Sequence, residues 1–310
     1  MRQRSDARAV LERLRQARDR ARTALVEPAP PTPRDPAPVT SKAGRNLPQA
    51  ICVGVGLGLI VIAGLVFDIR IFVGLVILII SAGMWEVARA VALRSIRVPL
   101  PPLWVGGIGM MISAWIGGTT PLLMAFALTC GAVLVWRVLE GGGIDAVRDA
   151  TAGMLVAGYL PFLASFAVLL AASDQGAWAV IAFIGVVVGS DTGGYIAGVL
   201  FGRHPMCPSI SPKKSWEGFI GSLTLASAVG IALSVVGLGL PWWVGALLGI
   251  AGVIAGTAGD LAESLLKRDL GLKDMGSILP GHGGIMDRLD SLVFTAPAAY
   301  LILQYFLVVP

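Results

Sequence analysis

The sequence predicts an all-α, polytopic integral membrane protein with about nine transmembrane helices. Hydrophobic residues make up 55% of the 310-residue chain and charged residues only 14%, against about 25% charged residues in an ordinary soluble domain. The mean hydropathy is +0.79, which excludes a disordered chain and disfavours a soluble one. The apolar runs are long and do not alternate with polar residues, so they suit helices and not the strands of a transmembrane barrel.

Residues 1–48 precede the apolar part of the chain and are expected to form a basic, proline-rich cytoplasmic arm. The first 45 residues hold 11 of the 24 lysines and arginines, and residues 28–38 contain six prolines, which cannot continue a helix. In a chain this apolar, such an arm is expected to face anionic lipid rather than nucleic acid. No apolar stretch directly follows its basic start, so it does not resemble a secretory signal.

Apolar runs follow one another after residue 48, each close to the roughly 20 residues that a helix needs to cross a bilayer. We divide them into an N-terminal membrane region of about five spans (49–172) and a C-terminal membrane region of about four spans (173–310), in which most of the remaining polar residues lie. The second region carries two cytoplasmic loops (202–216 and 260–288). The expected spans lie near residues 49–67, 70–92, 100–117, 119–138, 153–172, 176–201, 217–238, 240–259 and 289–309.

Basic residues gather in every second loop. Arg94 with Arg97, Arg137 with Arg148, and the two long loops would lie on the same side as the basic arm, whereas the other loops carry few charges. By the positive-inside rule this side is cytoplasmic, so the N-terminus lies inside. The arm is rich in arginine and alanine, and this composition indicates a bacterial inner (plasma) membrane as the location of the protein. We therefore expect a multi-pass protein of that membrane whose site faces the cytoplasm.

The densest polar cluster covers residues 259–291, between the last two expected spans. Asp260, Glu263, Ser264 and Lys267 follow the i, i+3, i+4, i+7 spacing that places side chains on one helix face. If the eighth helix continues beyond its apolar run as far as Arg268, these four side chains share one face; otherwise they lie in the predicted loop.

Two further carboxylates, Asp287 and Asp290, are spaced i, i+3 at the start of the ninth helix, after a glycine-rich turn. Ionisable residues within a membrane bundle are costly and usually mark a functional site. Asp260 and Asp287 are hard oxygen ligands that suit magnesium, and two carboxylates from different helices could hold one or two metal ions beside a phosphate. A structural salt-bridge network is the alternative.

A second cluster, Ser211, Lys213 and Lys214, directly precedes the helix expected from residue 217. Lysines act as point charges for phosphate, and a helix N-terminus adds a positive dipole end. The segment therefore predicts a phosphate site, although it contains no P-loop motif. The alternative is a basic loop that only touches anionic lipid headgroups.

Two acidic residues lie inside expected spans. Asp191, next to Ser190 in the sixth span, and Glu86 in the second each carry a charge whose insertion costs about 2.5–3.5 kcal/mol. Each needs a cation, a lysine or a metal as partner, or must stay a protonated, hydrogen-bonded acid. His282 lies in the glycine-rich turn, where the spacing supports no Ser–His–Asp arrangement.

Residues 264–290 resemble the signature of the phosphatidate cytidylyltransferases, also called CDP-diacylglycerol synthases. That signature joins a Ser-x-apolar-Lys-Arg segment, a Lys-Asp pair, a Pro-x-His-Gly-Gly turn and an Asp-Arg-x-Asp segment. Residues 190–192 and 211–218 also resemble motifs of this family. The signature residues of this chain are Ser264, Lys267, Arg268, Lys273, Asp274, Pro280, His282, Gly283, Gly284, Asp287, Arg288 and Asp290.

This resemblance implies a nucleotidyltransferase of phospholipid biosynthesis that converts CTP and phosphatidate into CDP-diacylglycerol and diphosphate. It implies Mg2+, with a second metal ion of open identity, at Asp260 and Asp287, and catalytic roles for these two residues with Lys267 and Arg288. The partners are then CTP, phosphatidate and the lipid bilayer, without nucleic acid, and a homodimer is left open. The implied substrate-binding residues are Ser190, Asp191, Ser211, Lys213, Lys214, Ser264, Arg268, Lys273, His282, Gly283, Gly284 and Asp290.

Two other kinds of function stay open at this point. A CTP-dependent lipid kinase, or a cytidylyltransferase for another lipid phosphate, would use a similar scaffold. A cation-coupled secondary transporter could use Asp191 and Asp260 as cation sites, but it predicts broken helices in paired halves and needs no CTP. Magnesium-dependent release of diphosphate from CTP, on addition of phosphatidate, would separate the expected enzyme from the transporter.

Overall fold

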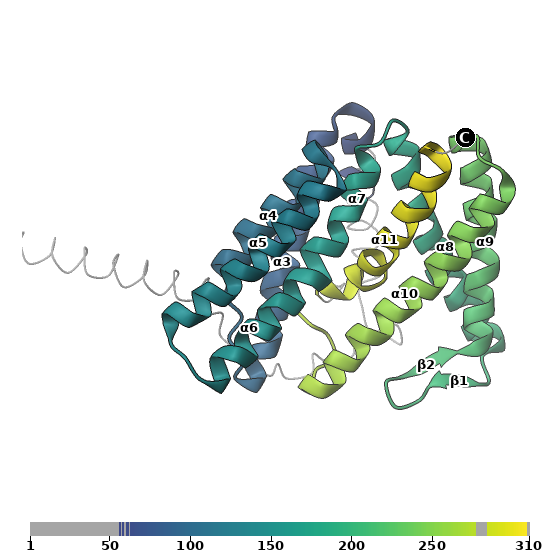
Figure 1. Cartoon of the computed structure of the whole chain (residues 1–310). Helices are drawn as coiled ribbons and strands as arrows, with labels where there is room; N and C mark the ends of the chain where they lie inside the picture. Colours follow the sequence, from purple (N-terminus) through teal and green to yellow (C-terminus); the bar gives the residue numbers. More distant parts are fainter. Residues whose placement is uncertain (1–55, 57, 59, 62, 277–283, 309–310) are drawn as a thin grey trace, which may run out of the picture.

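The computed structural model describes residues 56, 58, 60–61, 63–276 and 284–308. Within these residues, eight helices are long and apolar enough to cross a membrane, which confirms the predicted all-α, polytopic membrane class. The elements, labelled as in Figure 1, are α3 (Ile69–Val91), η1 (Ala92–Arg94), α4 (Leu100–Gly117), α5 (Thr119–Glu140), α6 (Ile144–Ala157), η2 (Gly158–Phe162), α7 (Leu163–Ala171), α8 (Gly176–Phe201), β1 (Pro205–Cys207), β2 (Ser211–Ser215), α9 (Trp216–Leu238), α10 (Trp242–Leu270) and α11 (Met286–Val308).

The predicted spans and the observed helices largely coincide. The predicted arm (1–48) and about half of the first predicted span (49–67) lie outside the described residues. The residues of 56–67 that are described are helical. The other eight predicted spans each match one of the eight spanning helices, with α6, η2 and α7 together forming a single span.

Two helices are longer than their hydropathy predicts. The helix predicted over 153–172 begins at Ile144, and the helix predicted over 240–259 continues to Leu270. In both, polar side chains find partners within the protein, so the helix persists where the apolar run stops. The loop predicted over 260–288 was therefore wrong at its start, because residues 260–270 belong to α10. The condition under which Asp260, Glu263, Ser264 and Lys267 share one helix face is met.

The span from α6 to α7 changes its hydrogen-bonding pattern at the π-helical turn η2, which contains Pro161. Proline lacks an N–H and disrupts an α-helical turn, and a single π turn accommodates such a break. Ser165 Oγ donates a hydrogen bond to the Pro161 carbonyl at 2.6 Å. The span therefore remains continuous through the break.

The segment predicted as a loop over 202–216 instead contains an antiparallel hairpin, β1 with β2, in which Pro205 pairs with Ser215. Its strands are short and show no alternation of apolar and polar residues, so hydropathy did not predict them. Ser215 ends β2 and caps α9, because its Oγ accepts a hydrogen bond from Gly218 N at 3.1 Å.

Helix α11 runs between two groups of helices, α3 to α7 on one side and α8 to α10 on the other (Figure 1). Val293 of α11 belongs to one hydrophobic core, mainly of the first group. Ala296, Ala299 and Leu303 belong to a second core, which contains residues of α8 to α10. The two groups therefore share α11, whose first turn carries Asp287.

Glycines allow α8 and α9 to pack with their backbones in contact. A Cβ atom on Gly193 would lie 2.4 Å from the carbonyl oxygen of Gly221, and one on Gly221 would lie 2.6 Å from that of Gly193. Lipid removes most of the hydrophobic drive between membrane helices, so close packing of small residues becomes important. This contact holds the hairpin that joins the two helices at a fixed position beside α10.

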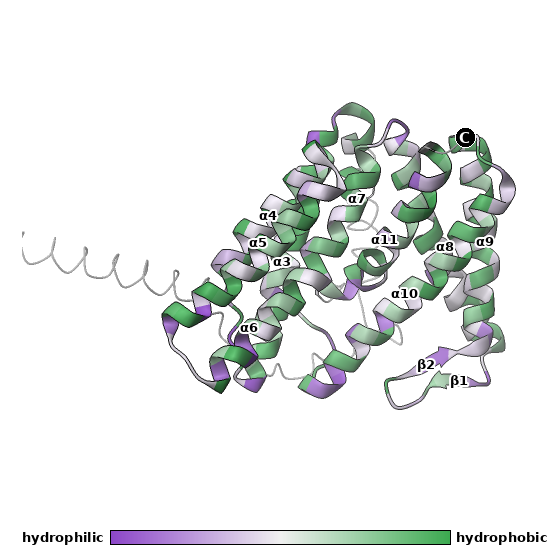
Figure 2. Cartoon of the chain, viewed as in Figure 1, coloured by the Kyte–Doolittle hydropathy of each residue, from purple (hydrophilic) through white to green (hydrophobic). Residues whose placement is uncertain are grey.

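The described basic loops meet at one end of the bundle. An Arg94 guanidinium nitrogen donates to the Asp269 carbonyl, which joins η1 to the end of α10. Arg268 Nε donates to the Ile210 carbonyl at 3.3 Å, which joins α10 to the hairpin. Figure 2 shows hydrophilic residues gathered at this end, around α6, the end of α10 and the hairpin. The grouping predicted from the alternation of charged loops is therefore present.

Asp149 anchors α6 at this end. It is 2% exposed, accepts a hydrogen bond from Arg97 N at 3.0 Å and forms an ion pair with Arg137. Removing one partner of a buried pair leaves an uncompensated charge, at a cost of about 3 kcal/mol. We therefore expect Asp149→Ala to lower the thermal midpoint of the detergent-solubilised protein clearly.

The matched control for Asp149→Ala is Asp145→Ala on the same helix. The Asp145 side chain is 79% exposed, and exposed ion pairs contribute little to stability. The thermal midpoint of Asp149→Ala should therefore fall, whereas that of Asp145→Ala should stay close to that of the unmodified chain. Equal midpoints for the two variants and the unmodified chain would show that the buried pair does not stabilise α6.

Candidate active site between α10 and α11

Helices α10 and α11 touch at the level of their charged residues. A Cβ atom on Gly259 would lie 2.3 Å from the Asp290 carbonyl oxygen and 3.0 Å from Phe294 Cβ, so this crossing requires glycine. Asp260 follows Gly259 directly and is thereby brought against the first turns of α11.

The predicted charged face of α10 is present, and its members are paired. Lys267 Nζ lies 2.6 Å from Glu263 Oε2 and 2.8 Å from Asp287 Oδ1. The Glu263 side chain is 1% exposed. One lysine therefore joins a buried carboxylate of its own helix to a carboxylate at the start of α11.

Asp287 is held by main-chain donors as well as by Lys267. Its Oδ2 accepts hydrogen bonds from Met275 N at 3.1 Å and from Gly284 N at 2.9 Å. A carboxylate in the first turn of a helix also interacts favourably with the helix dipole. Asp287 therefore fixes the backbone on both sides of segment 277–283, which lies outside the described residues.

Glu86 of α3 reaches the same backbone. Its Oε2 accepts a hydrogen bond from Met286 N at 3.0 Å, and the side chain is buried. A Cβ atom on Gly284 would lie 2.8 Å from Glu86 Oε2 and 2.8 Å from Asp287 Oδ2, and one on Gly276 would lie 2.1 Å from Glu86 Oε1. The backbone at Gly276 and Gly284 therefore lies close against Glu86. The N–H of Met286 is a partner for its buried carboxylate.

Lys214 crosses from the hairpin to α10 and pairs with Asp260, at 2.5 Å between Nζ and Oδ2. The Asp290 carboxyl group lies against those of Asp260 and Glu263. Asp191 of α8 lies within electrostatic range of Asp260 and Lys214. Carboxyl groups this close repel one another when ionised, so the arrangement calls for cations or shared protons.

A cavity of about 250 Å³ lies beside the Lys214–Asp260 pair, between the hairpin, α8, α9 and α10. It is close to the lower size limit of small-molecule pockets, about 300 Å³. Ser222 Oγ donates to the Ser190 carbonyl at 2.7 Å and holds two of its walls together. Its polar lining includes Ser190, Asp191, Lys213, Lys214, Ser215 and Asp260.

The predicted site residues fall into groups by position. Some line this cavity or belong to the connected lysine and carboxyl groups: Ser190, Asp191, Lys213, Lys214, Asp260, Lys267, Gly284, Asp287 and Asp290. Others lie on the hairpin, on α10 or in the turn after it: Ser211, Ser264, Arg268 and Lys273. Arg288 lines a different cavity on another face of α11 and also lies within electrostatic range of Asp191. His282 and Gly283 lie outside the described residues.

Tyr159, in the π turn η2, is a candidate that the sequence reasoning missed. Among the described residues its buried hydroxyl has no hydrogen-bond partner. Its ring packs edge-on against Phe294 of α11, with centroids 5.4 Å apart, and it lies within electrostatic range of Glu263 and Asp290. A buried, unpaired hydroxyl is rare and calls for a ligand or water. The only sequence signal is Pro161, which indicates a break in the span.

The donor chemistry of this site fits a hard divalent cation. Within the described part of the chain, no three acidic, histidine or cysteine side chains form a ready-made metal site. Magnesium, however, usually binds one or two carboxylates and completes its shell with water and phosphate oxygens. A bound cation would offset the mutual repulsion of the ionised carboxyl groups of Asp260, Glu263 and Asp290. A purely structural salt-bridge network explains the lysine pairs but not the polar cavity beside them.

Comparison with known proteins gives one consistent result. The family model described as "Cytidylyltransferase family" matches residues 48–306. The chain is 40% identical over 289 residues to the phosphatidate cytidylyltransferase of Mycobacterium bovis, covering 89% of this chain and 94% of that protein. It is 42% identical over 279 residues to the protein of that name from Mycobacterium leprae, covering 85% and 89%.

A more distant relative, the phosphatidate cytidylyltransferase of a Synechocystis strain, is 31% identical over 286 residues, covering 83% of this chain and 94% of that protein. The range matched by the family model includes α3 to α11 up to residue 306, and with them all the predicted site residues. The signature at 264–290 and the match over most of the chain agree. The chain therefore belongs to the cytidylyltransferase family.

Proposed function

We propose that this protein is a phosphatidate cytidylyltransferase, which converts CTP and phosphatidate into CDP-diacylglycerol and diphosphate. The observation that carries the proposal is the Lys214–Asp260 pair beside a polar cavity, joined through the carboxyl groups of Asp290 and Glu263 to Lys267 and Asp287. Family membership and the names of the relatives support the same reaction.

In this reaction a phosphate oxygen of phosphatidate attacks the α-phosphorus of CTP. The bond from that phosphorus to the oxygen bridging to the β-phosphate breaks, and diphosphate leaves. The attacking phosphate is already ionised, so positioning and charge stabilisation matter more than general base catalysis. Lys213 and Lys214 would offset phosphate charge from the hairpin, and Lys267, Arg268 and Arg288 would do so from α10 and α11.

The metal site is part of this proposal. Asp260 and Asp287 would hold Mg2+, with a second ion of open identity, and the bound metal would offset the charge of the triphosphate and of the departing diphosphate. Lys267 would keep Asp287 oriented from its place between two carboxylates. Glu86 would hold the adjoining backbone, so that Asp287 needs little rearrangement when substrate binds.

The proposed setting is the inner (plasma) membrane, with the basic end of the bundle in the cytoplasm, where CTP is available. The concentration of arginines and lysines at that end supports this orientation. Large exposed apolar side chains, among them Leu128, Leu139 and Val236, support the bilayer as a partner. A homodimer also stays a proposal, to be tested by cross-linking in membranes.

The test is incubation of the purified chain with phosphatidate, magnesium and CTP labelled at the α-phosphorus. Label should enter the lipid as CDP-diacylglycerol, with one diphosphate released for each product. A CTP-dependent kinase would instead transfer the unlabelled γ-phosphate to a lipid alcohol and leave the label in CDP. A transporter would leave CTP intact, and either of these two outcomes would overturn the proposal.

The crossing at Gly259 makes a further prediction for this reaction. In a helix interior alanine is favoured over glycine by up to about 1 kcal/mol, so a loss in Gly259→Ala must come from the clash with α11. A displacement of about 1 Å at a catalytic site can cost about a hundredfold in rate, and we expect a fall in kcat of that size. Gly131→Ala, where the space is open, is the matched control and should keep full activity. An equally active Gly259→Ala would show that this contact does not position the site.

A further inference from the structure

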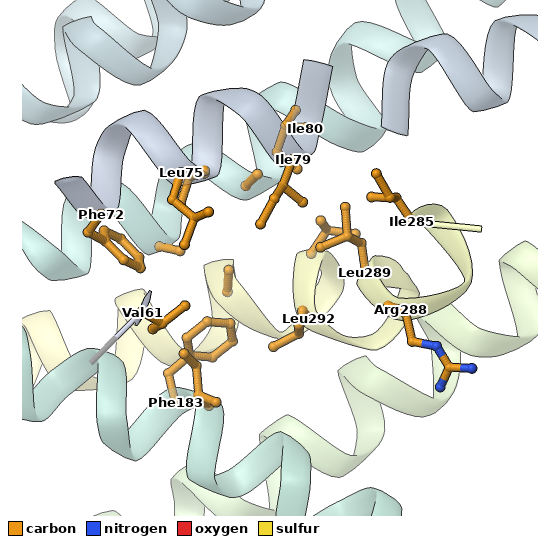
Figure 3. A pocket seen from close by; sticks show the side chains of 16 residues that line it. Val61, Phe72, Leu75, Ile79, Ile80, Phe183, Ile285, Arg288, Leu289 and Leu292 are labelled. Carbon is orange, nitrogen blue, oxygen red and sulfur yellow. The ribbon is translucent and has the colours of Figure 1, made fainter. Parts of the chain in front are cut away.

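A second cavity, of about 280 Å³, lies between α3, α7, α8 and α11 (Figure 3). Among the described residues that line it, Arg288 alone has a polar side chain, and the others are hydrocarbon. The cavity is on another face of α11 from the one that meets α10, so it does not overlap the polar cavity beside Lys214.

The two ends of this cavity differ in chemistry. Figure 3 shows Arg288 and Ile285 at one end and Phe72, Phe183 and Val61 at the other. Arg288 directly follows Asp287 in the first turn of α11. The charged end of the apolar cavity is therefore next to the candidate active site, and its aromatic end is deep in the bundle. A ligand that fits has an anionic head and an apolar tail.

We propose that this cavity receives one acyl chain of phosphatidate, with the lipid phosphate near Arg288, and that Phe72 and Phe183 limit the length of the chain accepted. The proposal rests on the proposed function and adds to it a site for the lipid tail. At about 280 Å³ the cavity suits a single hydrocarbon chain better than a whole two-chain lipid. The guanidinium at its mouth matches the phosphate that must lie beside the reacting groups.

We expect the cavity to orient the lipid phosphate and to select acyl-chain length, and to add little to the affinity for the lipid. Bilayer hydrocarbon is as apolar as the cavity wall, so moving a chain between them gains little hydrophobic free energy. A chain that fits holds its phosphate in one place relative to Asp287, which raises the rate of attack. A chain that is too long meets the aromatic side chains and draws the phosphate away from the site.

Ala167 of α7 offers a direct test, because it lines the cavity and leucine would fill part of it. Ala167→Leu should lower kcat/KM for dipalmitoyl phosphatidate about tenfold, with little change for the dioctanoyl substrate. Phe72→Ala should shift the preference the other way, toward longer chains. Ala232→Leu is the matched control, since Ala232 is exposed on α9 and does not line this cavity; its substrate ratio should equal that of the unmodified chain.

Direct labelling covers the case in which a variant fails to fold. A phosphatidate with a diazirine at the end of its acyl chain should label peptides of α3, α7 or α8 in the unmodified protein. Unlabelled phosphatidate should compete for this labelling, and phosphatidylcholine should not. Equal competition by phosphatidylcholine would assign the cavity to any membrane lipid and overturn the proposal.

Failure of this inference is distinguishable from failure of the proposed function. If the unmodified chain makes no CDP-diacylglycerol, the function itself is wrong. If the unmodified chain is active but the chain-length ratio is the same in Ala167→Leu, Phe72→Ala and the control, only the acyl-chain site is wrong.

Discussion

Asp287→Ala is expected to abolish CDP-diacylglycerol synthesis, lowering kcat about a thousandfold or more, while the chain still inserts and folds. Loss of a single group that stabilises transition-state charge costs about a hundred- to a thousandfold. Asp287 also holds Lys267, Met275 N and Gly284 N in place. Its removal therefore takes away a proposed metal ligand and releases the backbone beside it.

Two further variants separate these contributions. Asp287→Asn keeps a carbonyl oxygen for the two backbone N–H groups but loses the charge, so it should be nearly as inactive with a better-preserved thermal midpoint. Asp269→Ala removes an exposed carboxylate from the end of the same bundle and should stay active. Activity is read as labelled lipid, and folding as the elution profile and thermal midpoint in detergent. Substantial synthesis by Asp287→Asn would contradict the role of its charge.

The charged face of α10 was predictable because it depends only on local spacing. Residues three and four apart share a helix face whatever the rest of the chain does, and Asp260, Glu263 and Lys267 do so here. The unusual cost of these groups in a membrane also indicated where the chemistry lies. Hydropathy failed at the ends of α6 and α10, since it measures transfer to lipid and not the pairing of charges inside the protein.

Contacts between distant parts of the chain were not predictable in this way. Glu86 binds the N–H of Met286, 200 residues away, and Lys214 reaches Asp260 across 46 residues. Both depend on how the helices pack, which no single segment encodes. Sequence reasoning foresaw that Glu86 and Asp191 need partners, but not which partners. Tyr159 was missed because a lone tyrosine in an apolar span is ordinary, and its contact with α11 depends on how the helices pack.

The Lys214–Asp260 pair leads to a prediction with two effects of opposite sign. Lys214 is the cation already in contact with a proposed metal ligand, at 2.5 Å, and it lines the polar cavity. If CTP binds there, the Lys214 ammonium group offsets negative charge of the triphosphate. Without CTP, the same group competes with Mg2+ for Asp260. Lys214→Met should therefore lower kcat/KM for CTP by about a hundredfold or more, yet raise the affinity of the nucleotide-free protein for magnesium.

Both effects of Lys214→Met can be measured on the same preparation. Initial rates at varied CTP give kcat/KM, and calorimetric titration with magnesium alone gives the metal affinity. Lys214→Arg keeps the charge and should retain part of the activity with no gain in metal affinity. Arg203→Met removes an equal charge at an exposed position beside the hairpin, so it controls for net charge. If Lys214→Met and Arg203→Met bind magnesium and use CTP equally well, Lys214 does not share a site with either ligand. A gain in metal affinity confined to Lys214→Met would place the metal beside the position of the lost ammonium group, which contacts Asp260, independently of any turnover measurement.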